Sequence, residues 1–379
     1  MSVPLCIQKA EDPFPFPITD HVAVRWRESI VIWGGYNYHE SQPTDGSVVY
    51  CHSKGKWIRV VTSGDAPKSV WPTNVQVIED QLLVRSDYHM DTMWSLDLNK
   101  MIWSKHTPKG YPPPEISFHN TSSIYASWVH GGKMYCFGRG CKSASNQLFS
   151  YNTVSDSWEW PLQYGDLPTP RCRSLTVISG DKVFLFGDED KGVEYVPIND
   201  LYILDLIHMK WQKVLDMMPN EEDVDIDGAT LTLISPTTAL LFGSSKSWLL
   251  NLANAEKGRD ASLIWTKIPH HFSRVYHAAV LKPRGRGLWV IGGDMVNDDG
   301  DYEDATSDVL EISFNLVPLR DLAMDYVARN IGANDDSLRP DCLPINLRKD
   351  IEEHRSNMVL NFICSAEKGC EVCKRSDSK

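Results

Sequence analysis

The chain has 379 residues, enough for one large repeat domain or two ordinary domains. Hydrophobic residues make up 42% and charged residues 23% of the sequence, as in an ordinary folded protein. The formal net charge of −12 argues against a nucleic-acid-binding protein, which needs a basic surface to displace counterions from phosphates.

No segment of the sequence has the pattern of an export signal or a membrane span. Residues 1–14 lack a long apolar core. The most apolar later stretch, residues 231–250, is interrupted by Pro236, Gly243 and Lys246. The nine cysteines are an odd number without a disulfide framework. These features predict reduced thiols, no membrane partner, and a location in the cytoplasm, the nucleus or both.

A hydrophobic strand pattern recurs along the chain with a period of about fifty residues. Each copy is an apolar run, and in five of the six copies it ends at or beside a glycine, as in "IVIWGG" at 30–35 and "LWVIGG" at 288–293. The equivalent positions lie 49 to 56 residues apart and are Gly34, Arg85, Gly138, Gly187, Gly243 and Gly292. Because glycine tolerates positive φ and close backbone approach, we expect these strands to lie near a crowded centre.

A tryptophan keeps the same phase as the glycine strands. In five of the six units it ends the following strand pattern, at Trp57, Trp103, Trp158, Trp211 and Trp265. A large aromatic residue that recurs once per unit is expected in the core. We therefore predict that each tryptophan packs between adjacent sheets and has no ligand.

The two signals together predict an all-β fold, a six-bladed β-propeller over residues 20–315, because radial packing buries both faces of each four-stranded sheet. Residues 1–19 are expected to be an N-terminal extension. To close the ring, the segment "HVAVRW" at 21–26 is expected to pair with strands from late in the chain. Which end of the chain supplies the last strand stays open.

The glycine strand followed by tryptophan resembles the kelch repeat, and the resemblance extends over roughly residues 20–315. Only the first and sixth units keep two consecutive glycines, and the second unit has Arg85-Ser86 in their place. The resemblance implies a propeller with a ligand-binding face.

After the propeller the hydrophobic period changes to that of a helix. Residues 319–327 place an apolar stripe on one helix face, and Pro318 suits the first turn. A second short helix follows, with Leu343, Leu347 and Ile351 on one face. We therefore expect a helical region at 316–360 and a disordered tail at 361–379. In one interpretation these helices fold back and cover an edge of the propeller.

A second interpretation rests on two docking motifs. The first helix resembles an elongin-binding box, and the second resembles a cullin 2 box. The matching residues are Leu319, Ala323 and Val327 for the first, and Leu343, Pro344, Leu347 and Ile351 for the second. The whole chain thus resembles kelch-domain-containing substrate receptors of elongin–cullin 2 ubiquitin ligases, of the type that recognises C-terminal degrons. That resemblance implies a non-catalytic adaptor whose partners are elongin B/C, cullin 2 and a substrate protein or peptide terminus. A kelch scaffold without a ligase is the alternative.

The carboxylate-binding pocket of those receptors is not matched in this sequence. Its arginines follow the fourth glycine strand, where this chain has Asp188, Glu189 and Asp190, and such an acidic loop suits a basic ligand. The remaining candidates for substrate contact lie after glycine strands or between units, and they are Tyr36, Arg85, Arg139, Arg173, Arg274 and Tyr276. Arg139 and Arg274 are the leading candidates. The competing interpretation is that such arginines bond the backbone of a neighbouring blade.

Signals for metals and catalysis are incomplete. Residues 295–306 lack the carboxylates of a calcium loop. His270, His271 and His277 have no acidic or cysteine partner at ligand spacing. The tail offers three possible zinc ligands, Cys364 and the C-x-x-C pair Cys370 and Cys373, but no evident fourth one, and His354 is the nearest candidate. Because the sequence also has no nucleophile elbow, P-loop or H-E-x-x-H motif, we predict no catalytic residue, metal or cofactor.

Overall fold

The structure is a computed structural model. It describes residues 5–314 except 54, 69–71, 87–90, 114–125, 139–144, 172, 191–194, 197–199, 216–225, 227, 244–246, 269–272, 284–286 and 298–301. The predicted docking helices and the tail, residues 316–379, lie outside this part of the chain.

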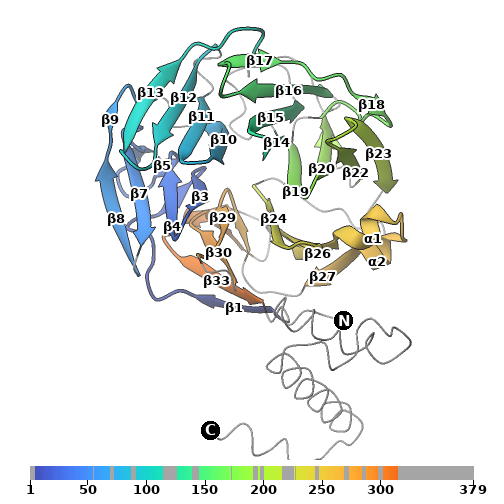
Figure 1. The fold of residues 1–379 in the computed structure, drawn as a ribbon. Helices are drawn as coiled ribbons and strands as arrows, with labels where there is room; N and C mark the ends of the chain where they lie inside the picture. Colours follow the sequence, from blue (N-terminus) through green and yellow to red (C-terminus); the bar gives the residue numbers. More distant parts are fainter. Residues whose placement is uncertain are drawn as a thin grey trace, which may run out of the picture. The chain divides into compact units, whose positions relative to one another are not determined.

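The described residues form six main sheets, each with four main antiparallel strands, and two small three-stranded sheets; Figure 1 shows the main sheets arranged in a ring. The first three contain β3 (Val22–Trp26), β4 (Ser29–Trp33), β7 (Val48–Ser53) and β8 (Lys56–Val61); β10 (Pro72–Ile78), β11 (Gln81–Ser86), β12 (Met93–Asp97) and β13 (Ile102–His106); and β14 (Ala126–His130), β15 (Lys133–Gly138), β16 (Gln147–Asn152) and β17 (Ser157–Glu159). The fourth and fifth contain β19 (Arg173–Ser179), β20 (Lys182–Asp190), β22 (Leu201–Asp205) and β23 (Lys210–Leu215); and β24 (Thr230–Ser235), β25 (Thr238–Phe242), β26 (Ser247–Asn251) and β27 (Trp265–Ile268). The sixth contains β29 (Ala278–Leu281), β30 (Gly287–Ile291), β33 (Val309–Phe314) and β1 (Leu5–Lys9). The predicted all-β propeller architecture is confirmed.

The ring closes through the N-terminal strand, and the predicted closure was wrong. β3 pairs with β4 and is the innermost strand of the first sheet. The closing strand is β1, which pairs with β33 from Leu5↔Phe314 to Lys9↔Leu310. The interval 1–19 is therefore more than an extension, because β1 supplies the fourth strand of the sixth sheet and satisfies the backbone groups along the edge of β33.

The recurring tryptophans lie between adjacent sheets, as predicted. Each packs against the second strand of the preceding sheet in the ring. The ring centroids are 5.8 Å apart for Trp103 and Trp33, 5.0 Å for Trp211 and Phe137, 4.9 Å for Trp265 and Phe186, and 6.2 Å for Trp57 and Trp289. Trp158 joins Ile78, Leu83 and Met93 of the second sheet in one buried cluster. The hydrophobic core is therefore divided among the contacts between neighbouring sheets, and we call each of these contacts a joint.

The fifth sheet has a longer connection between its two outer strands than the first four sheets have. Its outer strands β26 and β27 are joined by two short helices, α1 (Leu252–Glu256) and α2 (Ala261–Ile264). The side chain of Asn251 caps α1 by accepting a hydrogen bond from the backbone N–H of Asn254 at 3.0 Å. The longer connection buries three apolar side chains, those of Leu252, Ala255 and Ile264. They add apolar contacts to the cluster between the fourth and fifth sheets.

A second glycine repeat was missed from the sequence. The linkers between sheets add short parallel segments beside the outer strands, such as β9 (Ser63–Gly64) on β13 and β18 (Tyr164–Gly165) on β23. Gly165 has φ +82, and a Cβ there would lie 2.2 Å from the carbonyl oxygen of Trp211. Gly64 approaches the carbonyl oxygen of Trp103 in the same way. Tryptophan and glycine thus form one repeated contact at the rim.

We expect Gly165→Ala to lower the free energy of unfolding by roughly 2–4 kcal/mol, because it adds a backbone clash to the strain of a positive φ. Equilibrium urea denaturation measures the change. Gly180→Ala is the matched control, since Gly180 has φ +58 and nothing within 4 Å of its would-be Cβ. Equal losses for the two variants would show that the close approach to Trp211 has no energetic weight.

Candidate functional site

Two small three-stranded sheets extend from the first and sixth main sheets. One contains β2 (Ile18–Thr19), β5 (Tyr36–Asn37) and β6 (Gln42–Pro43), and the other contains β28 (Arg274–Val275), β31 (Asp294–Val296) and β32 (Tyr302–Ala305). Their strands β5 and β31 begin directly after the two Gly-Gly pairs, so Tyr36 and Asp294 hold equivalent positions in the repeat. Gly35 allows this arrangement, since a Cβ there would lie 2.4 Å from the carbonyl oxygen of Thr19.

Backbone hydrogen bonds join these two small sheets where the ring closes. The N–H of Gly293 donates to the carbonyl oxygen of Ile18 at 2.8 Å, and the N–H of Asp20 donates to that of Tyr276 at 3.0 Å. The junction brings together six residues from opposite ends of the described chain. We call this group the closure seam; its members are Thr19, Asp20, Tyr36, Tyr38, Tyr276 and Asp294.

The closure seam has an unusual electrostatic environment. Burial raises the pKa of the Asp294 carboxyl to about 6. Its Oδ1 atom is buried and has no hydrogen-bond partner among the described residues. Burial, and then the nearby carboxylates of Asp294 and Asp20, raise the pKa of Tyr38, while the hydroxyl of Thr19 acts in the opposite direction. The seam therefore concentrates negative charge around partly buried aromatic rings.

Of the sequence-predicted candidates, Tyr36 and Tyr276 lie in the closure seam, and both side chains are partly exposed. Arg274 lies close by but is only 3% exposed. Its guanidinium donates to the carbonyl oxygens of Gly292 at 3.2 Å and Asp308 at 3.0 Å. Burial lowers its pKa to about 10, against the opposing effect of the Asp308 carboxylate. Arg274 thus bonds the backbone next to the seam. This is the structural role that the sequence indicated as the alternative to ligand contact.

The other predicted residues are not brought to the seam. Arg85 is 2% exposed in β11 and donates to the carbonyl oxygen of Pro113 at 2.5 Å. The backbone of Arg173 pairs with Asp188 in the fourth sheet, but its side chain lies outside the described residues, as does all of Arg139. The docking residues lie outside them too; these are Leu319, Ala323, Val327, Leu343, Pro344, Leu347 and Ile351.

Arg171, missed from the sequence, does in the fourth sheet what Arg274 does in the sixth. Its guanidinium donates to the carbonyl oxygen of Gly187 at 3.0 Å and to both carboxylate oxygens of Asp200, at 2.8 and 3.2 Å. Arg171 is fully buried and Asp200 is 2% exposed. A signal existed, because each arginine lies four residues before an equivalent inner-strand position, at Leu175 and Ala278.

Two buried histidines, His21 and His277, also hold equivalent positions, one residue before the inner strand starts. Each is 5% exposed. Burial lowers the pKa of each to about 3. The ring of His277 contacts the hydroxyl of Thr230 at 2.9 Å. No group of three or more potential metal ligands occurs within the described residues, and His277 belongs to a joint between sheets.

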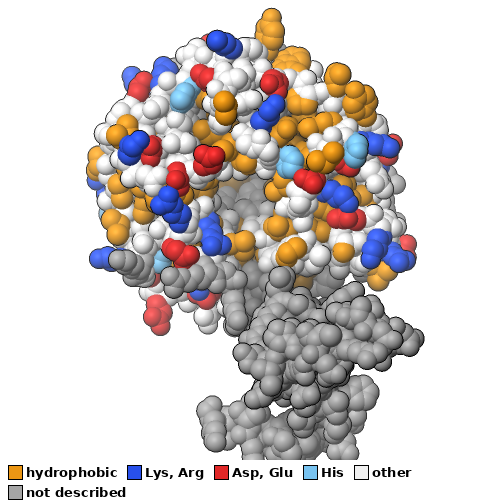
Figure 2. Space-filling model, in the orientation of Figure 1, with side chains coloured by type: hydrophobic (Ala, Val, Ile, Leu, Met, Phe, Trp, Pro, Cys, Tyr) orange, Lys and Arg blue, Asp and Glu red, His pale blue; other side chains and the backbone are white. Residues whose placement is uncertain are grey.

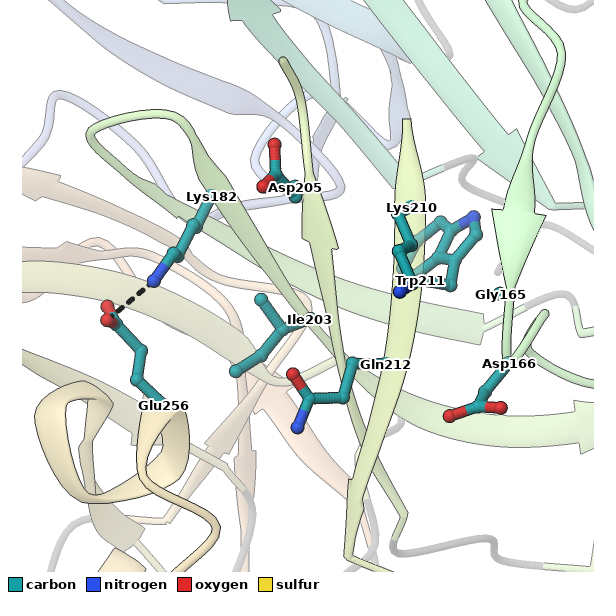
Figure 3. Close-up of a pocket in the computed structure, with 9 residues that line it drawn as sticks. All are labelled: Gly165, Asp166, Lys182, Ile203, Asp205, Lys210, Trp211, Gln212 and Glu256. Atoms are coloured by element: carbon teal, nitrogen blue, oxygen red, sulfur yellow. Dashed lines mark hydrogen bonds and ion pairs between the residues drawn. The ribbon is translucent and has the colours of Figure 1, made fainter. Parts of the chain in front are cut away.

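A cavity of about 420 Å³ lies beside the fourth sheet, away from the closure seam (Figure 3). Its polar groups mostly bond to the protein itself. Lys182 pairs with Glu256 at 2.6 Å, and Asp205 accepts hydrogen bonds from the backbone N–H groups of Ile207 and His208. This cavity therefore offers few unsatisfied groups to a ligand.

Hydrophobic side chains gather at the rim over β17 and β18 (Figure 2). They include Tyr111, Trp160, Leu162 and Tyr164, which are 77%, 53%, 75% and 57% exposed. The indole N–H of Trp160 donates to the carbonyl oxygen of Tyr111 at 2.9 Å, which ties two linkers together. Exposed apolar groups in such a cluster are typical of protein-interaction surfaces. Within the described part of the chain, helices are too short and too polar to cross a bilayer.

Comparisons with known proteins agree with the fold. A family model described as the KLHDC2/KLHL20/DRC7 Kelch-repeats domain matches residues 20–244, more than half of the chain. The chain is 22% identical over 330 residues to Kelch domain-containing protein 2 of Bos taurus, which covers 76% of this chain and 78% of that protein. It is 34% identical over 106 residues to Rab9 effector protein with kelch motifs of Gallus gallus, covering 27% of this chain and 26% of that protein.

The fold is also similar to a solved structure described as "Structure of YjhT". The TM-score is 0.57 at 13% identity, with 80% of this chain and 99% of that chain covered. At this identity the likeness concerns the fold alone.

Proposed function

Because the chain belongs to the KLHDC2/KLHL20/DRC7 kelch-repeat family, a family of protein-interaction modules, we propose that it is the substrate-recognition adaptor of an elongin–cullin 2 ubiquitin ligase. In this proposal the propeller holds a degron of the substrate, which could be a C-terminal one, and the residues after β33 recruit the ligase. The adaptor is not an enzyme, since other subunits carry out ubiquitin transfer. It acts in the cytoplasm, the nucleus or both.

The observation that carries the proposal is the order of two motifs after the propeller. Leu319, Ala323 and Val327 follow the spacing of an elongin box, and the Leu-Pro pair at 343–344 opens the cullin-box pattern. The similarity to Kelch domain-containing protein 2 over 76% of the chain supports the same assignment. Narrow apolar stripes on short helices need a partner surface, which the helix-in-groove mode supplies.

The second candidate is a kelch scaffold without a ligase. The exposed rim cluster around Trp160 favours it, because this surface suits a protein partner without any contribution from the C-terminal motifs. The two candidates differ in what the C-terminal residues bind.

Affinity purification of the full chain from cells distinguishes the candidates. We expect the wild-type protein to recover elongin B/C and cullin 2. In Leu319→Asp the recovered amount of elongin, and with it that of cullin, should fall by at least about ten-fold, because the substitution places a charge in an apolar contact. Leu347→Asp should lose cullin and keep elongin.

Arg320→Asp and Arg348→Asp are the matched controls, since each adds the same side chain beside the predicted stripe instead of on it. Both should behave like the wild type. If the wild-type chain recovers neither elongin nor cullin, or if Leu347→Asp keeps its cullin, the adaptor proposal is wrong.

A further inference from the structure

We propose that the closure seam binds a cationic side chain, a lysine or an arginine, presented by a partner protein segment. The inference deepens the proposed function by naming the chemical class that the propeller selects, and it rests on the propeller receiving a partner segment. Its test does not involve elongin or cullin, so the two proposals can fail separately.

Among the described residues, several carboxylates lie in or beside the seam. Asp20 and Asp294 lie within it, and Glu40, Glu303 and Asp304 are exposed on the same two small sheets or the loops between their strands. Arg274, a cation on one of these sheets, is already bonded to the carbonyl oxygens of Gly292 and Asp308 and lies 3.4 Å from the Asp308 carboxylate. Because these contacts hold Arg274 at Asp308, a ligand cation would meet an Asp294 carboxylate with which Arg274 forms no ion pair.

The unsatisfied oxygen of Asp294 gives this site a specific acceptor. Its Oδ1 atom is buried and has no hydrogen-bond partner among the described residues, although the carboxyl as a whole is only partly buried. Leaving a buried polar atom unpaired costs free energy, and a ligand donor that reaches it as the neighbouring side chains turn aside recovers that cost. Guanidinium and ammonium groups are the donors that carboxylates bind most strongly.

Aromatic rings complete the site. Tyr36 and Tyr38 meet edge to face with ring centroids 5.0 Å apart, and Tyr38 is 43% exposed. The face of an aromatic ring attracts a cation, and the attraction grows as the cation loses water. Carboxylate and ring faces together favour a cationic side chain over a neutral polar one, and they repel the carboxylate of a chain terminus.

The backbone around the seam is held in place before a ligand arrives. The closing hydrogen bond from Gly293 to Ile18 is matched by one from the N–H of Ile18 to the carbonyl oxygen of Thr306 at 3.3 Å. The N–H of Tyr38 donates to the carbonyl oxygen of Pro17 at 3.1 Å. A site held by backbone bonds loses little conformational entropy on binding, which favours affinity.

Binding should depend on pH through Asp294. Tyr38 interacts with Asp294, and the other titratable or charged groups on the adjoining elements are Tyr36 and Asp20 from the first sheet and Arg274, His277 and Asp304 from the sixth. With the pKa of Asp294 near 6, the carboxyl is mostly neutral at pH 5 and ionised at pH 7.5. A cation should therefore bind roughly ten-fold more weakly at pH 5 than at pH 7.5.

The test uses pools of blocked heptapeptides with arginine, lysine, citrulline or glutamate at the centre and random uncharged flanks. Blocking both ends removes terminal charges. The full-length protein is immobilised, and the recovered peptides are counted. We expect arginine and lysine pools to be enriched roughly ten-fold over the citrulline pool, since citrulline keeps the shape of arginine without its charge.

Asp294→Asn should reduce that enrichment to below about two-fold, because the amide keeps the shape and removes the charge. Asp260→Asn is the matched control, because it changes the net charge by the same amount as Asp294→Asn. Asp260 is exposed at the start of α2 and makes no side-chain capping bond, so its replacement should have no other effect. Enrichment that is unchanged in Asp294→Asn, equal loss in both variants, or preference for the glutamate pool would each overturn the proposal.

Discussion

Arg171→Met is expected to lower the free energy of unfolding by about 3–5 kcal/mol, because it leaves the Asp200 carboxylate buried without its cation. Arg171 has no exposed surface and Asp200 is 2% exposed, so water cannot replace the lost partner. Equilibrium urea denaturation followed by tryptophan fluorescence measures the change.

The large effect comes from the number of bonds that one side chain makes. The guanidinium also donates to the carbonyl oxygen and the hydroxyl of Thr169, at 3.0 and 2.9 Å. Together with the bonds to Gly187 and Asp200, these contacts tie the residues before β19 to β20 and to the start of β22. The backbone N–H of Arg171 donates to the carbonyl oxygen of Ser145, which extends the joint to the third sheet.

The double variant Arg171→Met with Asp200→Leu separates charge from packing. It should be more stable than Arg171→Met alone, because it removes the buried, unpaired charge. Arg25→Met is the control; Arg25 is exposed and donates only to the nearby carbonyl oxygen of Arg27, so its loss should change stability by under about 0.5 kcal/mol. If the double variant is as unstable as Arg171→Met, the unpaired charge of Asp200 is not the main cause of the lost unfolding free energy.

The repeated joints could be predicted from the sequence because each uses residues at a fixed phase. The tryptophans met that condition, and their packing between sheets was predicted correctly. Arg171 and Arg274 met it too, each with an acidic partner 29 or 34 residues later. The pattern was missed because only two of the six units carry it, whereas tryptophan occurs in five.

The closure seam could not be predicted in the same way. It joins residues 18–38 to residues 276–306, and nothing local in either segment specifies the other. The ring must first close through β1, whose five residues are too short for a decisive strand pattern. The sequence indicated Tyr36 and Tyr276 as separate loop residues, and the structure shows that they lie in one site.

The buried histidines should make the protein sensitive to acid between pH 6.5 and 3. In the folded state the pKa values of His21 and His277 are about 3, below the ordinary value of 6.5. The unfolded chain therefore binds protons that the folded chain excludes, so stability present above pH 6.5 is lost as the pH falls toward 3. At pH 5 the expected loss is roughly 2 kcal/mol for each histidine.

Urea midpoints at pH 7.5 and pH 5.0 test this expectation. The double variant His21→Gln and His277→Gln should start less stable at pH 7.5, because it alters buried packing, yet lose much less stability on acidification. Asp294 acts in the opposite direction, since its raised pKa makes the folded chain bind a proton first. The comparison is therefore repeated in the Asp294→Asn background. With both histidines present, the urea midpoint should fall more steeply on acidification in that background than in the wild-type protein.

The exposed His39 and His208 provide the control, because their side chains stay in solvent and their replacement by glutamine should leave the fall in midpoint unchanged. If the buried and the exposed pairs flatten the pH dependence equally, the loss arises from the number of histidines and not from their burial. If only the buried pair does so, the joint between the last sheets and the first is the acid-sensitive part of the ring. The closure seam is built on that same joint, so acid would weaken the seam and its support over one range of pH.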